Sequence, residues 1–436
     1  MQENKMKTSL VWFRNDLRVR DNEVLSQACE SGNRVIGIYC LEPRNFAMTK
    51  FGFRKTGKYR AKFLLETLND LKNQLDRLNI DLLVYQKNAE DIIPTICKEL
   101  DVAEIFLQKE WTQEEVNTED RVKAACSSSL SWRSFYNQFL YHPEDIEFPI
   151  SNTPQVFTVF RKKLEKYISI REEHESIKLS EENRIENNTT IPTLSDLGFE
   201  DFDTPRQSAF PFRGGESQAL ERLDHYFFKT KKLGFYKKTR NGLVGLDYSS
   251  KFSPWLANGS ISARTIYWKV KEFEADFYKN QSTYWLIFEL IWRDYFKYIS
   301  LKHGNQIFKL EGILKKNYEW STKQRNIDRW IDGETHSDFV NANMIELKET
   351  GWMSNRGRQN VASYFAKELE LDWRIGAAYF ESLLLDYDVH SNYGNWMYVA
   401  GVGNDPRDRK FNVDLQAERY DADGRFRNLW LQTSLF

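Results

Sequence analysis

Short apolar runs alternate with helical patterns over the first third of the chain, and this alternation limits the fold more than any other feature. Between the second and third runs, residues 58–78 carry Phe63, Leu64, Leu68, Leu71 and Leu75 at helical spacing, and residues 89–100 form a helical pattern before the fourth run. The five runs have the length of buried strands; they are Thr8–Phe13, Arg34–Cys40, Asp81–Gln86, Glu104–Gln108 and Ser131–Phe135. Regular alternation of strand and helix predicts a doubly wound parallel α/β sheet.

Polar segments follow two of these strands, at the edge where ligands of such sheets bind. They are Trp12–Asp16 and Lys109–Glu115, so both are expected near any ligand. No G-x-G-x-x-G follows the first strand, and a dinucleotide fingerprint is therefore absent. Taken alone, the loop that starts at Trp12 can also be a charged loop that caps a helix at Asp21 or Asn22.

A polar stretch, residues 169–207, separates this pattern from the rest of the chain. It is rich in Glu, Asn, Ser and Thr and contains Pro192 and Pro205, which is typical of a connector that runs over the protein surface. Helical patterns follow it to the end. The sequence predicts an α/β domain in residues 1–140, an inter-domain connector in 141–210 and an all-α domain in 211–436, and 436 residues suffice for two such cores.

The stretch Thr350–Gly403 predicts two buried helices with a polar segment between them and the next apolar run. Its charges are Arg356, Arg358, Asp386 and Asp388. Polar groups beside buried helices need partners. Two interpretations are open: a core hydrogen-bond network that pairs Arg358 with a carboxylate, or a pocket for a large polar-aromatic ligand. Two tryptophans in this stretch favour the pocket, because interiors with several tryptophans often hold a flat cofactor or conduct electrons.

Two further segments allow both a functional and a structural interpretation. Residues 248–254 (YSSKFSP) place hydroxyls and backbone N–H groups before a predicted helix, which suits a phosphate but also a simple helix cap. In residues 285–298, Glu289 falls beside tryptophans on one helical face. An inward Glu is costly unless it is bonded or functional, although a surface Glu beside an aromatic core stripe is the alternative.

Together these motifs resemble the photolyase/cryptochrome family of blue-light flavoproteins. The segments WFRNDLRVRDN (residues 12–22) and YKKTRNGLVGLDYSSKFSPWLA (residues 236–257) are typical of the family, and the second is typical of its DASH-type cryptochromes. The resemblance runs from Trp12 to about Gly424. The remaining matched positions are Thr350-Gly351-Trp352-Met353, Asn355-Arg356, Arg358, Asp372-Trp373, Asp386, Asp388, Asn392 and Gly394-Asn395-Trp396.

The resemblance implies FAD in the helical domain and a folate antenna, 5,10-methenyltetrahydrofolate, in contact with Glu115. Arg358 is expected to pair with Asp386 beside the flavin ring, and Asn392 to lie against its N5. The positions that match FAD contacts are Tyr236, Ser249, Ser250, Lys251, Phe252, Ser253, Glu289, Arg293, Arg358, Asp386, Asp388, Asn392 and Asn395.

The resemblance also implies a reaction: light-dependent splitting of cyclobutane pyrimidine dimers in DNA by electron transfer from excited, reduced FAD. Glu289, Trp292 and Asn355 are expected to hold the dimer. Trp396, Trp373 and Trp320 match the family's electron-relay tryptophans, with Trp396 nearest the flavin and Trp320 nearest solvent. Tyr398 and Gln359 replace the Trp and Met of duplex photolyases, which implies a deoxyribodipyrimidine photo-lyase that prefers single-stranded DNA and acts weakly on duplex DNA.

The competing hypothesis is a blue-light photoreceptor or DNA-binding transcription regulator without repair activity. The sequence ends at Phe436, shortly past Gly424, without the long tail that signalling cryptochromes often carry, and this favours the enzyme. The net charge is -1, so DNA contact needs a local basic patch. Residues 229–240 and 315–329 supply such clusters, with aromatic residues interleaved.

The cysteines and the first residues of the sequence indicate the cellular compartment of the protein. Four cysteines lie far apart without C-x-x-C spacing, so neither a disulfide nor a metal site is expected. The first residues lack the apolar run of a signal peptide or membrane span. We therefore expect a cytoplasmic monomer without membrane contact.

Overall fold

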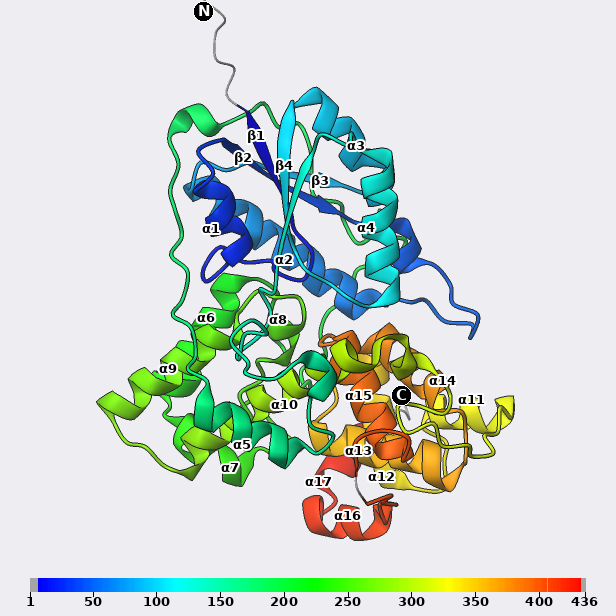
Figure 1. The fold of residues 1–436 in the computed structure, drawn as a ribbon. Helices are drawn as coiled ribbons and strands as arrows, with labels where there is room; N and C mark the ends of the chain where they lie inside the picture. Colours follow the sequence, from blue (N-terminus) through cyan, green and yellow to red (C-terminus); the bar gives the residue numbers. More distant parts are fainter. Residues whose placement is uncertain (1–6, 406, 433–436) are drawn as a thin grey trace, which may run out of the picture.

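The computed structural model describes residues 7–405 and 407–432 and shows an α/β part above a helical part (Figure 1). The first part holds one sheet of five parallel strands in the order β3-β2-β1-β4-β5. The strands are β1 (Thr8–Trp12), β2 (Arg34–Cys40), β3 (Leu82–Tyr85), β4 (Val102–Gln108) and β5 (Ser131–Phe135). The strand order changes direction between β1 and β4, so a crevice is expected beyond the carboxyl ends of these two strands.

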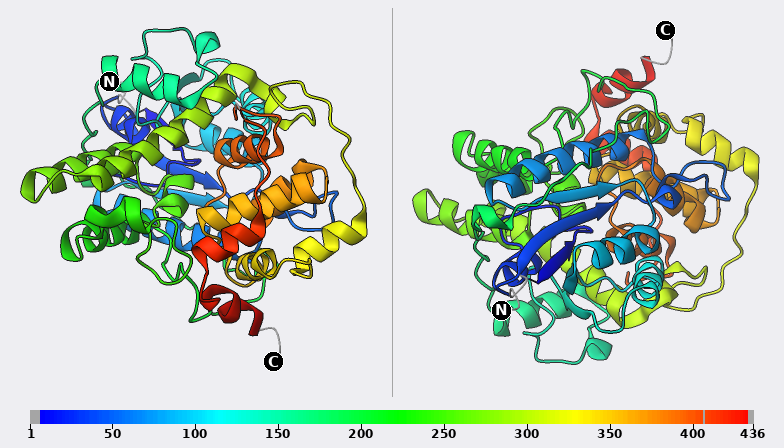
Figure 2. Two further views of the ribbon diagram at one scale, coloured as in Figure 1. Left: turned by 90° about the horizontal axis from the view of Figure 1, so that it is seen from below. Right: turned by 90° about the horizontal axis from the view of Figure 1, so that it is seen from above.

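Helices cover both faces of this sheet, as Figure 2 shows from above. Successive residues of β1 point to opposite faces: Val11 packs with α1 and α2, and Leu10 packs with α3 and α4. These helices are α1 (Glu23–Cys29), α2 (Lys58–Arg77), α3 (Ala89–Glu99) and α4 (Gln113–Ala125). The predicted doubly wound domain is confirmed, and each predicted strand lies within two residues of the observed one.

The segment 169–207 follows the surface of the α/β part and contains one short 3-10 turn, Glu181–Asn183. It is tied to the sheet, because the Asn183 side chain accepts from Val35 N at 2.7 Å and donates to Val35 O at 2.9 Å. Helix α5 (Phe157–Tyr167) instead buries Phe157 and Phe160 in the helical core. The boundaries 141–210 remain a prediction, and packing favours assigning α5 to the helical domain.

The helical part is built around α10, whose 23 residues make it the longest helix described. Asn280 and Thr283 form a capping box at its start, and Gly304 at φ 52° ends it. Residues 7–405 and 407–432 contain no helix long and apolar enough to cross a membrane. The helices of this part are α6 (Glu216–Asp224), α7 (Tyr236–Thr239), α8 (Ser253–Ala257), α9 (Ala263–Asp276), α10 (Gln281–His303), α11 (Gln324–Asp332), α12 (Asp338–Thr350), α13 (Asn355–Ser363), α14 (Trp373–Leu383), α15 (Val389–Ala400), α16 (Val413–Tyr420) and α17 (Arg425–Leu431).

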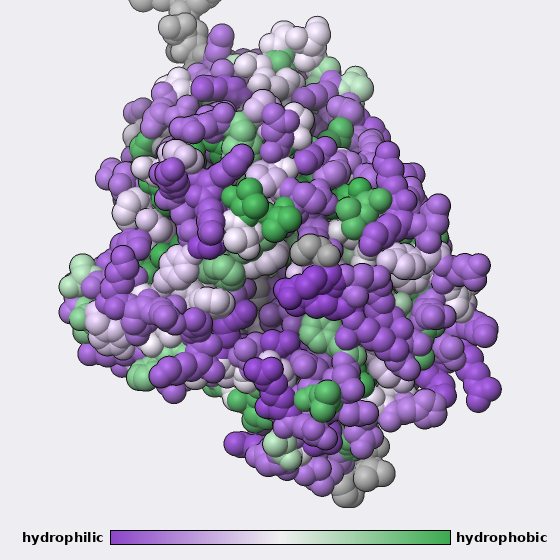
Figure 3. All heavy atoms as spheres, turned by 60° about the horizontal axis from the view of Figure 1, so that its bottom comes forward, coloured by the Kyte–Doolittle hydropathy of each residue, from purple (hydrophilic) through white to green (hydrophobic). Residues whose placement is uncertain are grey.

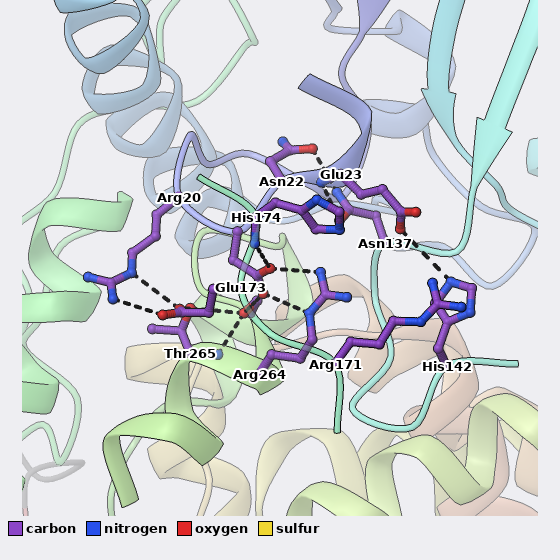
Figure 4. A network of polar contacts seen from close by, with 12 residues as sticks. Arg20, Asn22, Glu23, Asn137, His142, Arg171, Glu173, His174, Arg264 and Thr265 are labelled. Carbon is purple, nitrogen blue, oxygen red and sulfur yellow. Dashed lines mark hydrogen bonds and ion pairs between the residues drawn. The ribbon is translucent and has the colours of Figure 1, made fainter. Parts of the chain in front are cut away.

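A buried polar network, which we call the clamp, joins the loop after β1 to α9. Asp21 accepts two hydrogen bonds from Arg264, at 2.8 and 3.0 Å, and one from the backbone N–H of His174 at 3.0 Å. Arg18 donates to the carbonyls of Asp21, Gly259 and Asn137. Figure 4 shows the surrounding contacts, in which Glu173 links Arg20 to Thr265.

The clamp decides how the loop that starts at Trp12 is used. Asn22 is the N-cap of α1 and accepts from Leu25 N at 3.2 Å, so the helix-cap interpretation is right for this residue. Arg18 is 2% exposed, and its guanidinium makes the inter-domain hydrogen bonds of the clamp. Only the first part of the loop reaches a cavity.

Candidate functional site

Helices α13, α14 and α15 enclose a small hollow of about 90 Å³. The stretch that the sequence singled out folds so that charges and amides from its two ends meet there. The predicted residues that line it are Asn355, Arg358, Asp386, Asp388, Asn392, Asn395 and Trp396. The pocket interpretation of Thr350–Gly403 is therefore supported by geometry.

Arg358 and Asp386 form an ion pair on the wall of this hollow. Arg358 Nη2 lies 2.9 Å from Asp386 Oδ2, and Arg358 Nε donates to the carbonyl of Met353 at 2.9 Å. Asp386 Oδ1 is buried and has no hydrogen-bond partner. The expected pair is therefore present, and among the described residues its Asp386 Oδ1 remains without a partner, which leaves the pocket interpretation open.

Asp388 is held in its charged form by a residue that the sequence analysis did not single out. Lys297 Nζ lies 2.8 Å from Asp388 Oδ2, and Asp388 also accepts from Ser391 N at the start of α15. Burial alone would raise the pKa of Asp388, but Lys297, with His390 and Arg293 nearby, holds it below the usual range. A lysine within the apolar run of α10 is the sequence signal for this partner.

Asn392 and Asn395 project from the same helix as Trp396. Asn392 is 9% exposed, and its Nδ2 donates to the carbonyl of Ala377 at 2.9 Å. This bond fixes the amide so that its oxygen remains available. Asn395 is exposed and donates to the carbonyl of Ser391 at 2.7 Å.

Lys251 is buried without a hydrogen-bond partner for its ammonium group. It is 2% exposed, and its Nζ lies 3.3 Å from the ring centroid of Tyr248 and 4.5 Å from that of Trp352. Its backbone is in the left-handed region, at φ 67°. Burial lowers its pKa well below the ordinary value. A strained backbone that carries an unpartnered buried cation is the kind of feature found where a ligand binds.

Glu346 on α12 is the acidic counterpart of Lys251 and was not predicted. It is 0% exposed, and neither carboxylate oxygen has a hydrogen-bond partner. Burial raises its pKa to about 8, against the opposing effect of Lys251 and Arg358. Lys251 is chemically suited to an anionic diphosphate, and the unpartnered groups fit a large polar ligand such as FAD.

The loop that carries Lys251 is ordered by Arg222, another residue that was not predicted. Arg222 is 4% exposed, donates to the carbonyls of Ser249 at 3.1 Å and Ser250 at 3.2 Å, and pairs with Asp247 at 2.7 Å. Nothing in the local sequence of α6 indicates this role, because its partners lie 25 to 28 residues further on.

The other residues expected at a diphosphate differ in exposure. Ser250, Phe252 and Tyr236 are buried, whereas Ser253 is exposed at the start of α8. Helix α8 has five residues, so its macrodipole adds little, and side chains must supply most of the attraction for an anion.

Glu289 and Trp292 lie on α10, next to helix α15. Glu289 Oε1 is 2.8 Å from Arg240 Nη2, and burial raises the pKa of Glu289. The Trp292 ring stacks on Phe157 with centroids 3.7 Å apart and meets the edge of Tyr398 at 6.1 Å. Tyr398 is on α15, the helix that also lines the hollow, so Trp292 and Tyr398 lie in contact beside that part of the helix.

The three predicted relay tryptophans differ in burial. Trp373 is 0% exposed, Trp396 is 2% exposed and Trp320 is only half-buried. The Trp396 ring packs on Gly376, where an added Cβ would lie 2.2 Å away, and Gly376 is three residues after Trp373 on α14. A β-bridge between Ser321 and Leu371 brings Trp320 to the same region.

A larger cavity of about 450 Å³ lies between the carboxyl edge of the sheet and the helical part. It shares Tyr387 and Asp388 with the small hollow. Arg293 lines this cavity and donates to the carbonyls of Gln138 at 2.5 Å and Leu256 at 3.1 Å, and it is absent from the lining of the small hollow.

Glu115 lines this cavity and also an adjoining one of about 380 Å³ that reaches Trp12, Arg14 and Asn15. Glu110 lies beside it, and burial together with the Glu115 charge raises the pKa of Glu110 to about 7. Gln108 and Gln138 each turn a buried Oε1 without a partner into the same region. The cavity therefore offers several acceptors to a ligand rich in N–H groups.

Comparison with known proteins gives consistent matches over the chain. The DNA photolyase family model matches residues 9–178, and the model of the FAD binding domain of DNA photolyase matches residues 285–434. A cryptochrome DASH of Gloeobacter violaceus is 46% identical over 428 residues, which cover 98% of this chain and 85% of that protein. A cryptochrome DASH of Xenopus laevis is 46% identical over 425 residues, which cover 96% and 81%.

The fold agrees with these matches. The crystal structure of a Synechocystis sp. cryptochrome superposes with a TM-score of 0.93 at 44% identity, covering 98% of this chain and 89% of that one. The predicted FAD-binding character of the helical domain is confirmed by the family match.

Proposed function

Because this chain belongs to the photolyase/cryptochrome family, in its DASH group, and is thus a blue-light flavoprotein, we propose that it splits cyclobutane pyrimidine dimers and prefers them in single-stranded DNA. The carrying observation is the contact between Trp292 and Tyr398, since α15 carries Tyr398 and also contributes Asn395 and Trp396 to the hollow proposed for the flavin. FAD, when bound, supplies the light-driven electron transfer of the reaction.

The proposed work of the chain is to hold the cofactor and the dimer next to each other. Lys251 and the 249–253 loop hold the diphosphate, and the Arg358–Asp386 pair and Asn392 surround the ring. Glu289 hydrogen-bonds the dimer, Trp292 stacks against it and Asn355 holds its other side. Burial raises the pKa of Glu289, and the Arg240 guanidinium 2.8 Å away opposes this shift, so the carboxylate can accept hydrogen bonds from the N–H groups of the dimer.

The preference for single strands follows from a balance of two energies. Flipping a dimer out of a duplex costs a few kcal/mol of unstacking and unpairing. One base–aromatic stack is worth roughly 1–3 kcal/mol, and Tyr398 offers less stacking area than the Trp of duplex photolyases. Because the two energies are similar, the weaker stacking limits activity on duplex DNA, whereas a single strand needs little unpairing.

We also propose a folate antenna, 5,10-methenyltetrahydrofolate, in the inter-domain cavity at Glu115. A carboxylate can accept two hydrogen bonds from a pterin edge, and the unpartnered Gln108 and Gln138 oxygens add acceptors. The shared residues Tyr387 and Asp388 bring this cavity next to the flavin hollow. Glu115→Ala should remove the near-ultraviolet absorption that folate adds, and chromophore extracts that contain flavin alone, after folate addition, would contradict the antenna.

Trp396, Trp373 and Trp320 are proposed as an electron path between the hollow and solvent. The half-buried position of Trp320 suits the outer end, and the contact of Trp396 with the hollow suits the inner end. Trp396→Phe should slow light-driven reduction in the presence of a thiol more than either other replacement does. An unchanged rate would mean a different path.

The deciding experiment measures light-dependent loss of dimers in matched single- and double-stranded oligonucleotides with fully reduced FAD. The wild-type protein should act on the single strand and poorly on the duplex, and Glu289→Gln should reduce the rate on both. Equal rates on the two substrates would contradict the preference. Loss of neither substrate would favour the photoreceptor or transcription regulator.

A further inference from the structure

The corner where α9 meets α10 presents exposed aromatic rings among lysines. This corner is the leftmost edge of the helical part in Figure 1, and the same edge in Figure 3 shows hydrophobic residues among hydrophilic ones. The exposed fractions of Phe235, Phe277 and Tyr278 are 52%, 40% and 39%. We call these rings and their basic neighbours the corner patch; its residues are Lys231, Lys232, Phe235, Lys237, Lys238, Phe277, Tyr278 and Lys279.

The lysines of the corner patch have no acidic partner among the residues that the structure describes. Residues 231–240 contain no acidic residue. The flanking charges do have partners: Lys229 pairs with Asp224 at 3.0 Å and Arg240 pairs with Glu289 at 2.8 Å. None of the five patch lysines has an ion pair with another residue of the described ranges 7–405 and 407–432, so the surface attracts a polyanion.

The rings of the corner patch are placed for stacking. Phe235 makes no ring–ring or cation contact with the described residues, although almost half of it is covered. Lys231 Nζ lies 4.0 Å from the Phe277 ring centroid, and Lys237 Nζ lies 4.3 Å from that of Trp285. Alternating cations and open aromatic faces are what single-stranded nucleic acid binds, through its phosphates and its bases.

One face of α10 links the corner patch to the proposed dimer pocket. Lys237 donates to Gln281 at 2.8 Å and covers Trp285, and Arg240 pairs with Glu289. These α10 residues are four apart, so they share a face. From Gln281 to Trp292 the helix rises about 16 Å at 1.5 Å per residue, the length of about five stacked nucleotides at 3.4 Å each.

We propose that the corner patch binds the part of a DNA single strand that flanks the dimer. Its rings stack on the bases and its lysines contact the phosphates, while α10 guides the strand to Glu289 and Trp292. The identity of the strand rests on the proposed function, but the binding rests on the charge and rings of the patch. A patch of this size makes affinity depend on strand length, because a short oligonucleotide that fills the pocket cannot reach Phe235.

The test measures the affinity of the FAD-loaded protein for a dimer-free 20-nucleotide strand and for a 5-nucleotide strand by fluorescence anisotropy at several salt concentrations. For the long strand, the slope of log affinity against log salt should be less negative by about 2 in the triple variant K231Q/K232Q/K238Q. Each phosphate contact contributes about 0.7 to this slope. Phe235→Ala should weaken binding of the long strand about tenfold, as loss of one base stack does. Both variants should reduce the advantage of the long strand over the short one.

The matched control is K87Q/K98Q/K178Q, which removes three exposed lysines outside the helical domain. It should keep the wild-type salt slope. As a second measurement, photocrosslinking of a bromodeoxyuridine strand should label peptides from residues 229–240 and 277–285. Wild-type salt slope and length dependence in the triple variant, or crosslinks confined to other peptides, would overturn the proposal.

This experiment separates the corner patch from the proposed repair activity, because its strands contain no dimers and its readouts therefore do not depend on repair. If the wild-type protein repairs dimers but K231Q/K232Q/K238Q keeps the wild-type dependence on strand length, only the corner-patch proposal is refuted. A protein that binds strands through the patch but leaves dimers intact refutes the repair proposal alone.

Discussion

Two polar centres of this protein are equally buried but differ in how their charges are matched. At the clamp, Asp21 is 0% exposed and Arg264 is 2% exposed, and no buried polar atom of Arg18, Asp21 or Arg264 lacks a partner. In the helical domain, Glu346 is 0% exposed and Lys251 is 2% exposed, and their charged atoms have no hydrogen-bond partner among the described residues.

The difference separates a structural centre from a binding centre. Transfer of a charge from water is costly in both places, and the clamp offsets this cost with hydrogen bonds from the chain itself. At Lys251 and Glu346 the described residues supply no hydrogen bond to the charged atoms, which is the arrangement expected where a ligand binds. Burial alone therefore does not distinguish the two centres; the hydrogen bonds made by the buried charges do.

The largest expected effect comes from breaking the clamp. Asp21→Ala leaves Arg264 buried without its carboxylate, and removal of one partner from such a pair costs about 3–5 kcal/mol. We expect the free energy of unfolding, measured by urea titration of the FAD-loaded protein, to fall by this amount. Asp201→Ala, at an exposed ion pair, is the control and should change little. A wild-type urea midpoint in Asp21→Ala would mean that the clamp does not hold the two parts together.

Glu346→Gln should act in the opposite direction and stabilise the protein without FAD. The folded state keeps the Glu346 proton up to pH of about 8, whereas the unfolded state loses it near the ordinary pKa of 4.5. The folded state thus binds more protons in this window, and wild-type stability falls as pH rises through it. The variant lacks this fall, so its advantage should grow from near zero at pH 4.5 to about 3 kcal/mol at pH 7.

Urea titrations at pH 5, 6, 7 and 8 measure this difference. Because the Glu346 charge raises the pKa of Lys251, both proteins are compared in a Lys251→Met background, which removes the ionisation of Lys251 from the difference. Glu272→Gln, on the exposed side of α9, is the control and should follow the wild-type pH profile. Parallel profiles for Glu346→Gln and wild type would show that the Glu346 carboxyl has partners in solution.

Lys251→Met should weaken the binding of FAD without destabilising the protein that lacks FAD. The variant removes an unpartnered buried cation, so the protein without FAD should not lose stability, while FAD loses one charge-assisted bond to its diphosphate. Such bonds contribute about 1.5–3 kcal/mol, which is roughly a tenfold to hundredfold rise in the Kd of FAD. Isothermal titration of FAD into the apoprotein checks this. Unchanged affinity would place the diphosphate elsewhere.

The same contrast explains how far the sequence predicted this protein. The strands and α10 were predictable because hydrophobic periodicity is local, and the Arg358–Asp386 pair because a matched motif contains both residues. The use of Arg18 in the clamp was not predicted, since the partner carbonyl of Gly259 is 241 residues away. Glu346 was missed for the opposite reason: what marks it is the absence of partners, and absence leaves no sequence pattern.

Lys297 and Arg222 are intermediate cases. Lys297 interrupts an apolar helical run, and such a lysine indicates a buried acidic partner, but the sequence does not say that the partner is Asp388. Arg222 lies in an ordinary amphipathic helix, and only the folded loop shows that it binds the carbonyls of Ser249 and Ser250. Glu115 was predicted from a matched motif. Its neighbour Glu110 was not predicted, because only the folded structure shows that it is buried in the cavity beside Glu115.

The smallest expected effect is at His142, which lies beside the clamp near Glu23 and Arg171 (Figure 4). His142 is 4% exposed; its Nδ1 accepts from Glu144 N at 3.2 Å, so the neutral ring carries its proton on Nε2. Nε2 lies 3.9 Å from Glu23 Oε2 and makes no hydrogen bond. Burial, with Arg171 nearby, lowers the pKa of His142 to about 4.

Between pH 6.5 and 4 the unfolded state therefore binds a proton that the folded state does not, and stability should fall as pH falls through this window. His142→Gln lacks this term, so relative to its own value at pH 7.5 it should lose about 1 kcal/mol less than wild type at pH 5.5. Urea midpoints at the two pH values measure the difference, with His336→Gln, an exposed histidine, as the control. If His142→Gln and wild type lose equal stability between pH 7.5 and 5.5, the Glu23 carboxylate pairs with the protonated His142 ring. His142 would then have a charged partner, as Arg264 has in Asp21.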